Sequence, residues 1–172
     1  MLFRSPDDQL ACRAKSYLVP GNLVFPGKAK GDLTCVSYQT TNWSNPWAVG
    51  WVPSATLAKV DTASRPTAAD WLGKWKTTGA EITITRARDG RFVIKGLATL
   101  KVARDVRTGV LDAEVRPEGA MLAFADDGRP LAEAGEGDCL VRMRRLEQSL
   151  VVEDNGQCGG LGVSFTGLYR RN

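Results

Sequence analysis

The chain has 172 residues, of which 43% are apolar and 24% are charged, and its formal net charge is +4. This balance is typical of one large or two small globular domains and excludes disordered, collagen-like and coiled-coil chains. Histidine is absent, which excludes Ser-His-Asp and Cys-His catalytic groups and HExxH zinc sites. Glycine, proline or charge interrupts every apolar stretch well before the roughly 18 residues of a membrane span, so we expect none.

The positive charge is spread along the chain. Residues 1–65 carry seven lysines and arginines against four acidic residues, and residues 66–172 carry sixteen against fifteen. The densest basic cluster is Arg142, Arg144 and Arg145; in a strand, the first two share one face and Arg145 points to the other. A solvated strand face accounts for such a pair, so we expect no nucleic-acid partner.

The first sixty residues predict a small all-β unit. Pro-Gly and Gly-Asp turns between residues 20 and 32 separate short apolar runs. Residues 41–46 are turn formers and predict a loop, and residues 47–52 predict a strand that ends at Pro53.

A small, polar, proline-containing stretch at residues 61–70 marks a domain boundary. We therefore predict a first domain over residues 1–62, a linker over 63–70 and a second domain over 71–172.

The second domain predicts about eight antiparallel strands. Residues 81–87 (EITITRA) alternate apolar and polar side chains, Asp89-Gly90 marks a turn, and residues 91–99 return as a hairpin. The other predicted strands lie at 73–77, 109–115, 120–125, 138–146, 149–154 and 163–170. This regular spacing favours an antiparallel barrel, so the predicted fold class is all-β.

Four cysteines, Cys12, Cys35, Cys139 and Cys158, have no CxxC spacing, and we expect neither a metal nor a cofactor. Of the three possible pairings, the domain division favours Cys12 with Cys35 and Cys139 with Cys158, each bridge adding roughly 3 kcal/mol. Disulfides indicate an oxidising compartment, periplasmic or secreted. The alternative is four reduced thiols in a cytosolic protein. The first ten residues lack the basic lead and apolar core of an export signal, so we expect that signal to be removed or truncated.

Residues 50–57 (GWVPSATL) resemble the closing strand and following turn of bacterial SH3-like domains, where a Gly-Trp-Val step precedes a turn and an apolar anchor. Residues 14–38 are compatible with the earlier strands of such a barrel. The resemblance covers residues 10–60 or so and implies an SH3-like barrel that recognises peptides or cell-wall glycopeptide without catalysis.

The second domain carries two further resemblances. Residues 71–75 (WLGKW) resemble the Gly-x-Trp opening of lipocalin and avidin-like barrels. Residues 150–171 (LVVEDNGQCGGLGVSFTGLYRR) resemble the C-terminal segment of uncharacterised proteobacterial envelope proteins, some of which carry lysozyme-inhibitor-like domains upstream. Together they imply an eight-strand barrel in the bacterial cell envelope.

The tryptophans cluster between residues 43 and 75. Aromatic surfaces stack on sugar rings and on peptides, so Tyr17, Trp43, Trp47 and Trp51 are the candidate ligand-binding residues. The competing interpretation is that Trp51 and Trp75 pack in the core and that the other tryptophans cover the contact between two small domains. For Trp51 and Trp75 we favour packing in the core.

Two other segments are expected to be structural. Asp154 ends a predicted strand, where a carboxylate accepts backbone N–H groups and stabilises a tight turn. Residues 156–160 (GQCGG) lack the lysine and the helix of a phosphate-binding loop, so they predict a glycine-rich turn around a disulfide cysteine.

These features favour a non-catalytic binding protein of the cell envelope. Its expected partner is peptidoglycan or an envelope protein such as a wall-degrading enzyme, which it would inhibit. A small-ligand carrier with a lipocalin-like cavity is one alternative. A glycosidase that uses carboxylates alone is the other.

Overall fold

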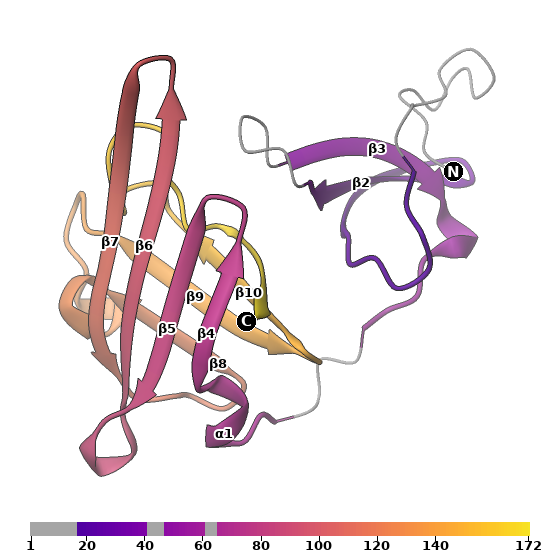
Figure 1. Ribbon diagram of the computed structural model, residues 1–172. Helices are drawn as coiled ribbons and strands as arrows, with labels where there is room; N and C mark the ends of the chain where they lie inside the picture. Colours follow the sequence, from indigo (N-terminus) through magenta and orange to yellow (C-terminus); the bar gives the residue numbers. More distant parts are fainter. Residues whose placement is uncertain (1–16, 41–46, 61–64) are drawn as a thin grey trace. The chain divides into compact units, whose positions relative to one another are not determined.

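The computed structural model describes residues 17–40, 47–60 and 65–172, and the chain in it is all-β (Figure 1). The chain divides into two compact units, residues 1–60 and 61–172. The first unit holds a three-strand antiparallel sheet, and the second holds a nearly closed eight-strand antiparallel barrel. The predicted fold class and the predicted number of barrel strands are confirmed. No helix in the described part of the chain has the length and apolarity needed to cross a membrane.

The sheet of the first unit is formed by β1 (Phe25–Lys30), β2 (Leu33–Gln39) and β3 (Trp47–Pro53), with β2 in the centre. One face is apolar because alternate side chains of the strands point to the same side. Val36, Tyr38 and Val52 are buried there. After β3, a 3₁₀ turn, η1 (Ser54–Thr56), brings Leu57 against this small core. The predicted strand and turn at residues 47–57 are confirmed.

The barrel is a meander in which the first and last strands also pair. Its strands are β4 (Gly73–Thr77), β5 (Ala80–Arg86), β6 (Phe92–Val102), β7 (Asp105–Val115), β8 (Met121–Ala125), β9 (Leu140–Leu146), β10 (Ser149–Asp154) and β11 (Gly167–Arg171). Their order is β7-β6-β5-β4-β11-β10-β9-β8. The pairing of β4 with β11 leaves the break in the barrel between β7 and β8, which are consecutive in the chain.

Large side chains fill the interior of the barrel. The largest of them are at most 2% exposed: Trp71, Trp75, Phe92, Phe124, Phe165 and Tyr169. Burial raises the pKa of the Tyr169 phenol, whose hydroxyl donates to the carbonyl of Phe165 at 2.8 Å. The interior is therefore a packed core, as the alternating pattern of the strands requires.

One end of the barrel is covered by a helical turn, α1 (Ala68–Trp71), whose first three residues belong to the predicted linker over residues 63–70. The hydroxyl and the backbone N–H of Thr67 both donate to the Asp70 carboxylate at 2.7 Å, so α1 is capped within its own sequence. These hydrogen bonds lower the pKa of Asp70. The indole N–H of Trp75 donates to the Trp71 carbonyl at 2.8 Å and fixes α1 on the core.

Two guanidinium groups pack across the Trp75 ring at this end, with centroid distances of 4.5 Å for Arg145 and 4.8 Å for Arg171. Arg171 also donates to the carbonyl of Asp70 at 2.6 Å. Arg142 and Arg144 are exposed, so the predicted division of the three arginines between two strand faces is confirmed.

Three strand ends differ from the predicted ones by three residues or more. β6 and β7 continue to a tight turn in which Ala103 adopts φ 52°. Glycine or asparagine usually takes this conformation, and neither is present at this turn, so the residue pattern does not predict it. β11 begins at Gly167 and not at residue 163, because the backbone N–H of Phe165 donates to the Asp154 carboxylate and not to a strand.

Candidate functional site

The break between β7 and β8 is the main irregularity of the barrel. β7 pairs with β6 and β8 pairs with β9, and no β-bridge joins β7 to β8. We call this break the seam. Unpaired strand edges are unusual in barrels, because closure normally satisfies every strand.

At one end of the seam, a 3₁₀ turn packs against β7. This turn, η3 (Asp126–Gly128), directly follows β8. A Cβ at Gly128 would lie 2.5 Å from the carbonyl oxygen of Glu114, and Gly128 has φ +83°. Only glycine allows this close approach, so the Asp-Asp-Gly turn sits directly on the edge of β7.

At the other end of the seam, the loop that carries the disulfide packs against the edge of β7, as η3 does at the first end. Cys139, which precedes β9, is bonded to Cys158, which confirms the predicted pairing of these two cysteines. The N–H of Gly160 donates to the carbonyl of Thr108 at 3.1 Å, and a Cβ at Gly109 would lie 2.4 Å from the Cys158 carbonyl oxygen. The predicted glycine-rich turn thus closes the end of the seam against β7.

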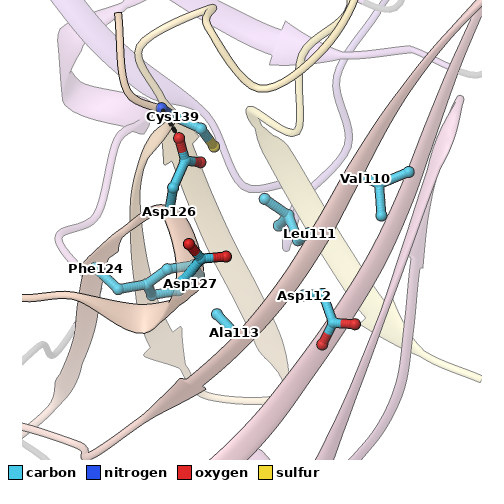
Figure 2. Close-up of a pocket in the computed structure, with 8 residues that line it drawn as sticks. All are labelled: Val110, Leu111, Asp112, Ala113, Phe124, Asp126, Asp127 and Cys139. Atoms are coloured by element: carbon cyan, nitrogen blue, oxygen red, sulfur yellow. Dashed lines mark hydrogen bonds between the residues drawn. The ribbon is translucent and has the colours of Figure 1, made fainter. Parts of the chain in front are cut away.

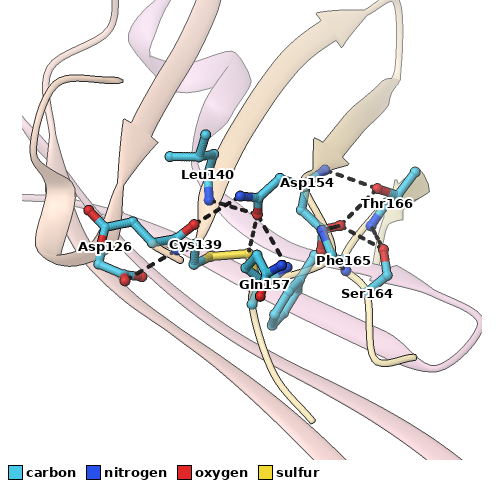
Figure 3. The surroundings of a disulfide bond; sticks show 12 residues. Asp126, Cys139, Leu140, Asp154, Gln157, Ser164, Phe165 and Thr166 are labelled. Atoms are coloured by element: carbon cyan, nitrogen blue, oxygen red, sulfur yellow. Dashed lines mark hydrogen bonds between the residues drawn. A yellow bond between two sulfur atoms is a disulfide. The ribbon is translucent and has the colours of Figure 1, made fainter. Parts of the chain in front are cut away.

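Asp154 organises the chain around this disulfide (Figure 3). Its carboxylate accepts the N–H groups of Gly156 and Phe165 and the hydroxyls of Ser164 and Thr166. The predicted role of Asp154 as an acceptor for backbone N–H groups at a tight turn is confirmed.

Between the two ends lies a partly open pocket of about 310 Å³. Its lining residues are Val110, Leu111, Asp112, Ala113, Phe124, Asp126, Asp127 and Cys139 (Figure 2). Leu111, Ala113 and Phe124 are buried barrel residues and form its apolar part. The β7 residues line one side, and Asp126 and Asp127 of η3 line the opposite side.

The three acidic residues that line the pocket differ in the contacts of their carboxylates. Asp126 accepts the backbone N–H of Cys139 at 3.2 Å, and Asp112 forms an exposed ion pair with Lys95 at 3.4 Å. Asp127 has φ 62°, and its carboxylate has no hydrogen-bond or ion-pair partner among the described residues. No group of three or more His, Cys, Asp or Glu side chains in the described ranges is arranged to hold a metal ion.

The predicted ligand-binding residues all belong to the first unit. Trp43 lies outside the described residues. Trp47 and Trp51 share one face of β3 with Val49, which is 63% exposed. The Trp47 ring meets that of Phe25 edge-on, with centroids 5.6 Å apart. We call these four residues, Phe25, Trp47, Val49 and Trp51, the aromatic face. Tyr17 is 75% exposed and precedes the sheet.

The favoured placement of Trp51 in the core is wrong. Trp51 is half-buried and pairs in register with Cys35, on the face opposite the buried Val52. The reason is the period of two along a strand: Val52 takes the core position, so its neighbour points away. Trp75, by contrast, is fully buried, as predicted.

Cys35 is half-buried and forms no disulfide with any described residue. Its predicted partner, Cys12, lies outside the described residues, so the pairing of these two cysteines stays a prediction.

No protein-family model, curated protein or solved structure matches this chain. The two candidate binding surfaces of the chain are the seam pocket and the aromatic face.

Sequence reasoning did not find the seam pocket. The Asp-Asp-Gly sequence of residues 126–128 is typical of a turn, but the closeness of this turn to β7 depends on how the barrel closes. The only local signal was the pair of adjacent carboxylates beside a glycine.

Proposed function

We propose that this chain is a non-catalytic binding protein of the bacterial cell envelope, and that its barrel holds a protein partner such as a wall-degrading enzyme. The observation that carries this proposal is the seam, where a partly open pocket lies beside a strand edge with no partner strand. Unpaired strand edges bind extended polypeptide through main-chain hydrogen bonds.

The compartment is consistent with this proposal. The disulfide between Cys139 and Cys158 fits an oxidising extracellular or periplasmic compartment. A partner that acts on the cell wall would meet the protein there.

The two alternative functions receive less support. A lipocalin-like carrier needs an enclosed apolar cavity, whereas aromatic side chains fill this barrel and the carboxylates of Asp126 and Asp127 line the seam pocket. A glycosidase needs two carboxyl groups available for catalysis, whereas Asp126 holds a backbone N–H and Asp112 pairs with Lys95.

Peptidoglycan is a second candidate ligand, favoured by the aromatic face of the first unit. Trp47 and Trp51 present half-buried rings beside the exposed Val49, and such surfaces stack on sugars and peptides. The order of β3, η1 and Leu57 agrees with the SH3-like resemblance of residues 50–57, which implies cell-wall recognition.

The test combines a pull-down on purified peptidoglycan with inhibition assays on a panel of wall-degrading enzymes. Inhibition that Asp127→Asn weakens and Trp47→Ala leaves unchanged supports the first candidate. Sedimentation with peptidoglycan that Trp47→Ala abolishes supports the second. Absence of both signals in the unmodified protein would refute the proposal as a whole.

A further inference from the structure

The edge of β7 in the seam has a defined length. The carbonyl of Thr108 bonds to Gly160, and the main-chain nitrogen and oxygen of Glu114 face Gly128. Both residues therefore direct their backbone groups into the seam. Because N–H and C=O groups of alternate strand residues point to the same edge, those of Val110 and Asp112 point there as well.

Loops occupy the two ends of this edge, and its middle has no partner strand. Thr108 and Glu114 are six residues apart, which in a strand is roughly 20 Å. The disulfide loop covers the first end and η3 covers the second, so Val110 and Asp112 remain, at the seam pocket. This window spans about three residues of an added strand.

The charge of the pocket selects the side chains of such a segment. The carboxylate of Asp112 lies on the outer face of the sheet, where it pairs with Lys95. Those of Asp126 and Asp127 line the pocket opposite β7, and that of Asp127 has no partner in the described chain. A lysine or arginine in the added segment would lie among them, with its aliphatic stem against Leu111 and Phe124. The exposed Val110, at 66%, and its cross-strand neighbour Leu97, at 48%, add apolar contact on the outer face of the sheet.

We propose that the seam binds a short extended segment of a partner protein, about three residues long and carrying lysine or arginine, as an added strand on the edge of β7. The inference rests on the proposed function and specifies the chemistry of the protein partner. It requires no change in the packed barrel core, because the pocket already exists without a partner.

The test uses the whole chain and the peptide acetyl-Thr-Lys-Val-Lys-Thr-amide, with binding followed by amide chemical shifts in NMR titrations. We expect saturable shifts at Val110 and Asp112. A peptide with both lysines replaced by glutamate should bind at least about ten-fold more weakly, because its charges repel the pocket. N-methylation of the central residue should abolish binding, because it removes a main-chain donor.

A matched pair of variants tests the charge. Asp127→Asn should weaken binding of the lysine peptide by about five-fold, since it removes one unpaired carboxylate. The control is Asp89→Asn, because Asp89 has φ 61°, is exposed and precedes a glycine in a 3₁₀ turn, as Asp127 does, but lies outside the pocket. The control variant should bind the peptide within two-fold of the unmodified protein.

Three outcomes would overturn the inference: no binding of the lysine peptide, equal binding of the N-methylated peptide, or equal binding of 1,5-diaminopentane, which has the charges but no backbone. Failure of the proposed function is a separate result. If the chain still inhibits a wall-degrading enzyme but binds no peptide at the seam, only the present inference fails.

Discussion

Removal of the Cys139–Cys158 disulfide tests how much this bond contributes to the stability of the barrel, since the disulfide loop covers one end of the seam. The bond closes a loop across 19 residues, and loop-closure entropy for that length corresponds to about 3 kcal/mol. For a unit of roughly 110 residues, this loss lowers Tm by roughly 10–15 °C. We expect the double variant Cys139→Ala/Cys158→Ala to unfold at a Tm lower by that amount.

The assay is thermal unfolding followed by far-ultraviolet circular dichroism, with two controls. Cys35→Ala should leave the transition of the barrel unchanged, because Cys35 belongs to the other unit. Wild-type protein reduced with dithiothreitol keeps both sulfur atoms, so its Tm separates loss of the bond from loss of buried volume. A decrease of less than about 3 °C in the reduced protein would contradict the entropic reasoning. It would show that Asp154 and the glycine contacts hold the loop without the bond.

The remaining predictions concern the elements that close the barrel. Gly128→Ala should destabilise the protein by about 1–3 kcal/mol more than Gly137→Ala in urea unfolding. Both glycines have positive φ, but only Gly128 lies against the backbone of another strand. Equal losses of unfolding free energy in the two variants would mean that η3 moves freely away from β7. Asp154→Ala should accelerate reduction of the disulfide by dithiothreitol, measured by thiol titration, because the loop loses four hydrogen bonds to that carboxylate; an unchanged rate would assign loop order to the disulfide alone. The Thr67 hydrogen bonds lower the pKa of Asp70, so the ionised carboxylate stabilises the fold at pH values above its ordinary pKa of 3.8, and this contribution is lost as pH falls through the lower pKa of the folded state. Asp70→Asn should therefore be less stable than wild type at pH 6, with a difference in unfolding free energy that shrinks towards pH 2. A difference that stays constant with pH would contradict this linkage.

Much of the second unit could be predicted because strand signals are local. The alternation of Ile82 and Ile84 with polar neighbours, followed by Asp89-Gly90, specifies a hairpin wherever the chain folds. The same holds for the glycine-rich turn at Cys158 and for the acceptor role of Asp154, whose hydrogen-bond partners lie within twelve residues. The aromatic residues of the first unit were also visible, but Trp51 was placed on the wrong face because two apolar neighbours compete for one core position.

An all-β chain with about eight barrel strands, a disulfide from Cys139 to Cys158 and the lack of histidine chemistry could all be inferred from residue order alone. The place where the barrel stays open could not. The pairing of β4 with β11 closes the meander at its ends, and Gly109 and Gly128 let two loops take the place of strand pairing on β7. Hydrogen bonds between strands and contacts of glycine with distant backbone are non-local. Composition and periodicity therefore cannot predict which strand edge is left without a partner.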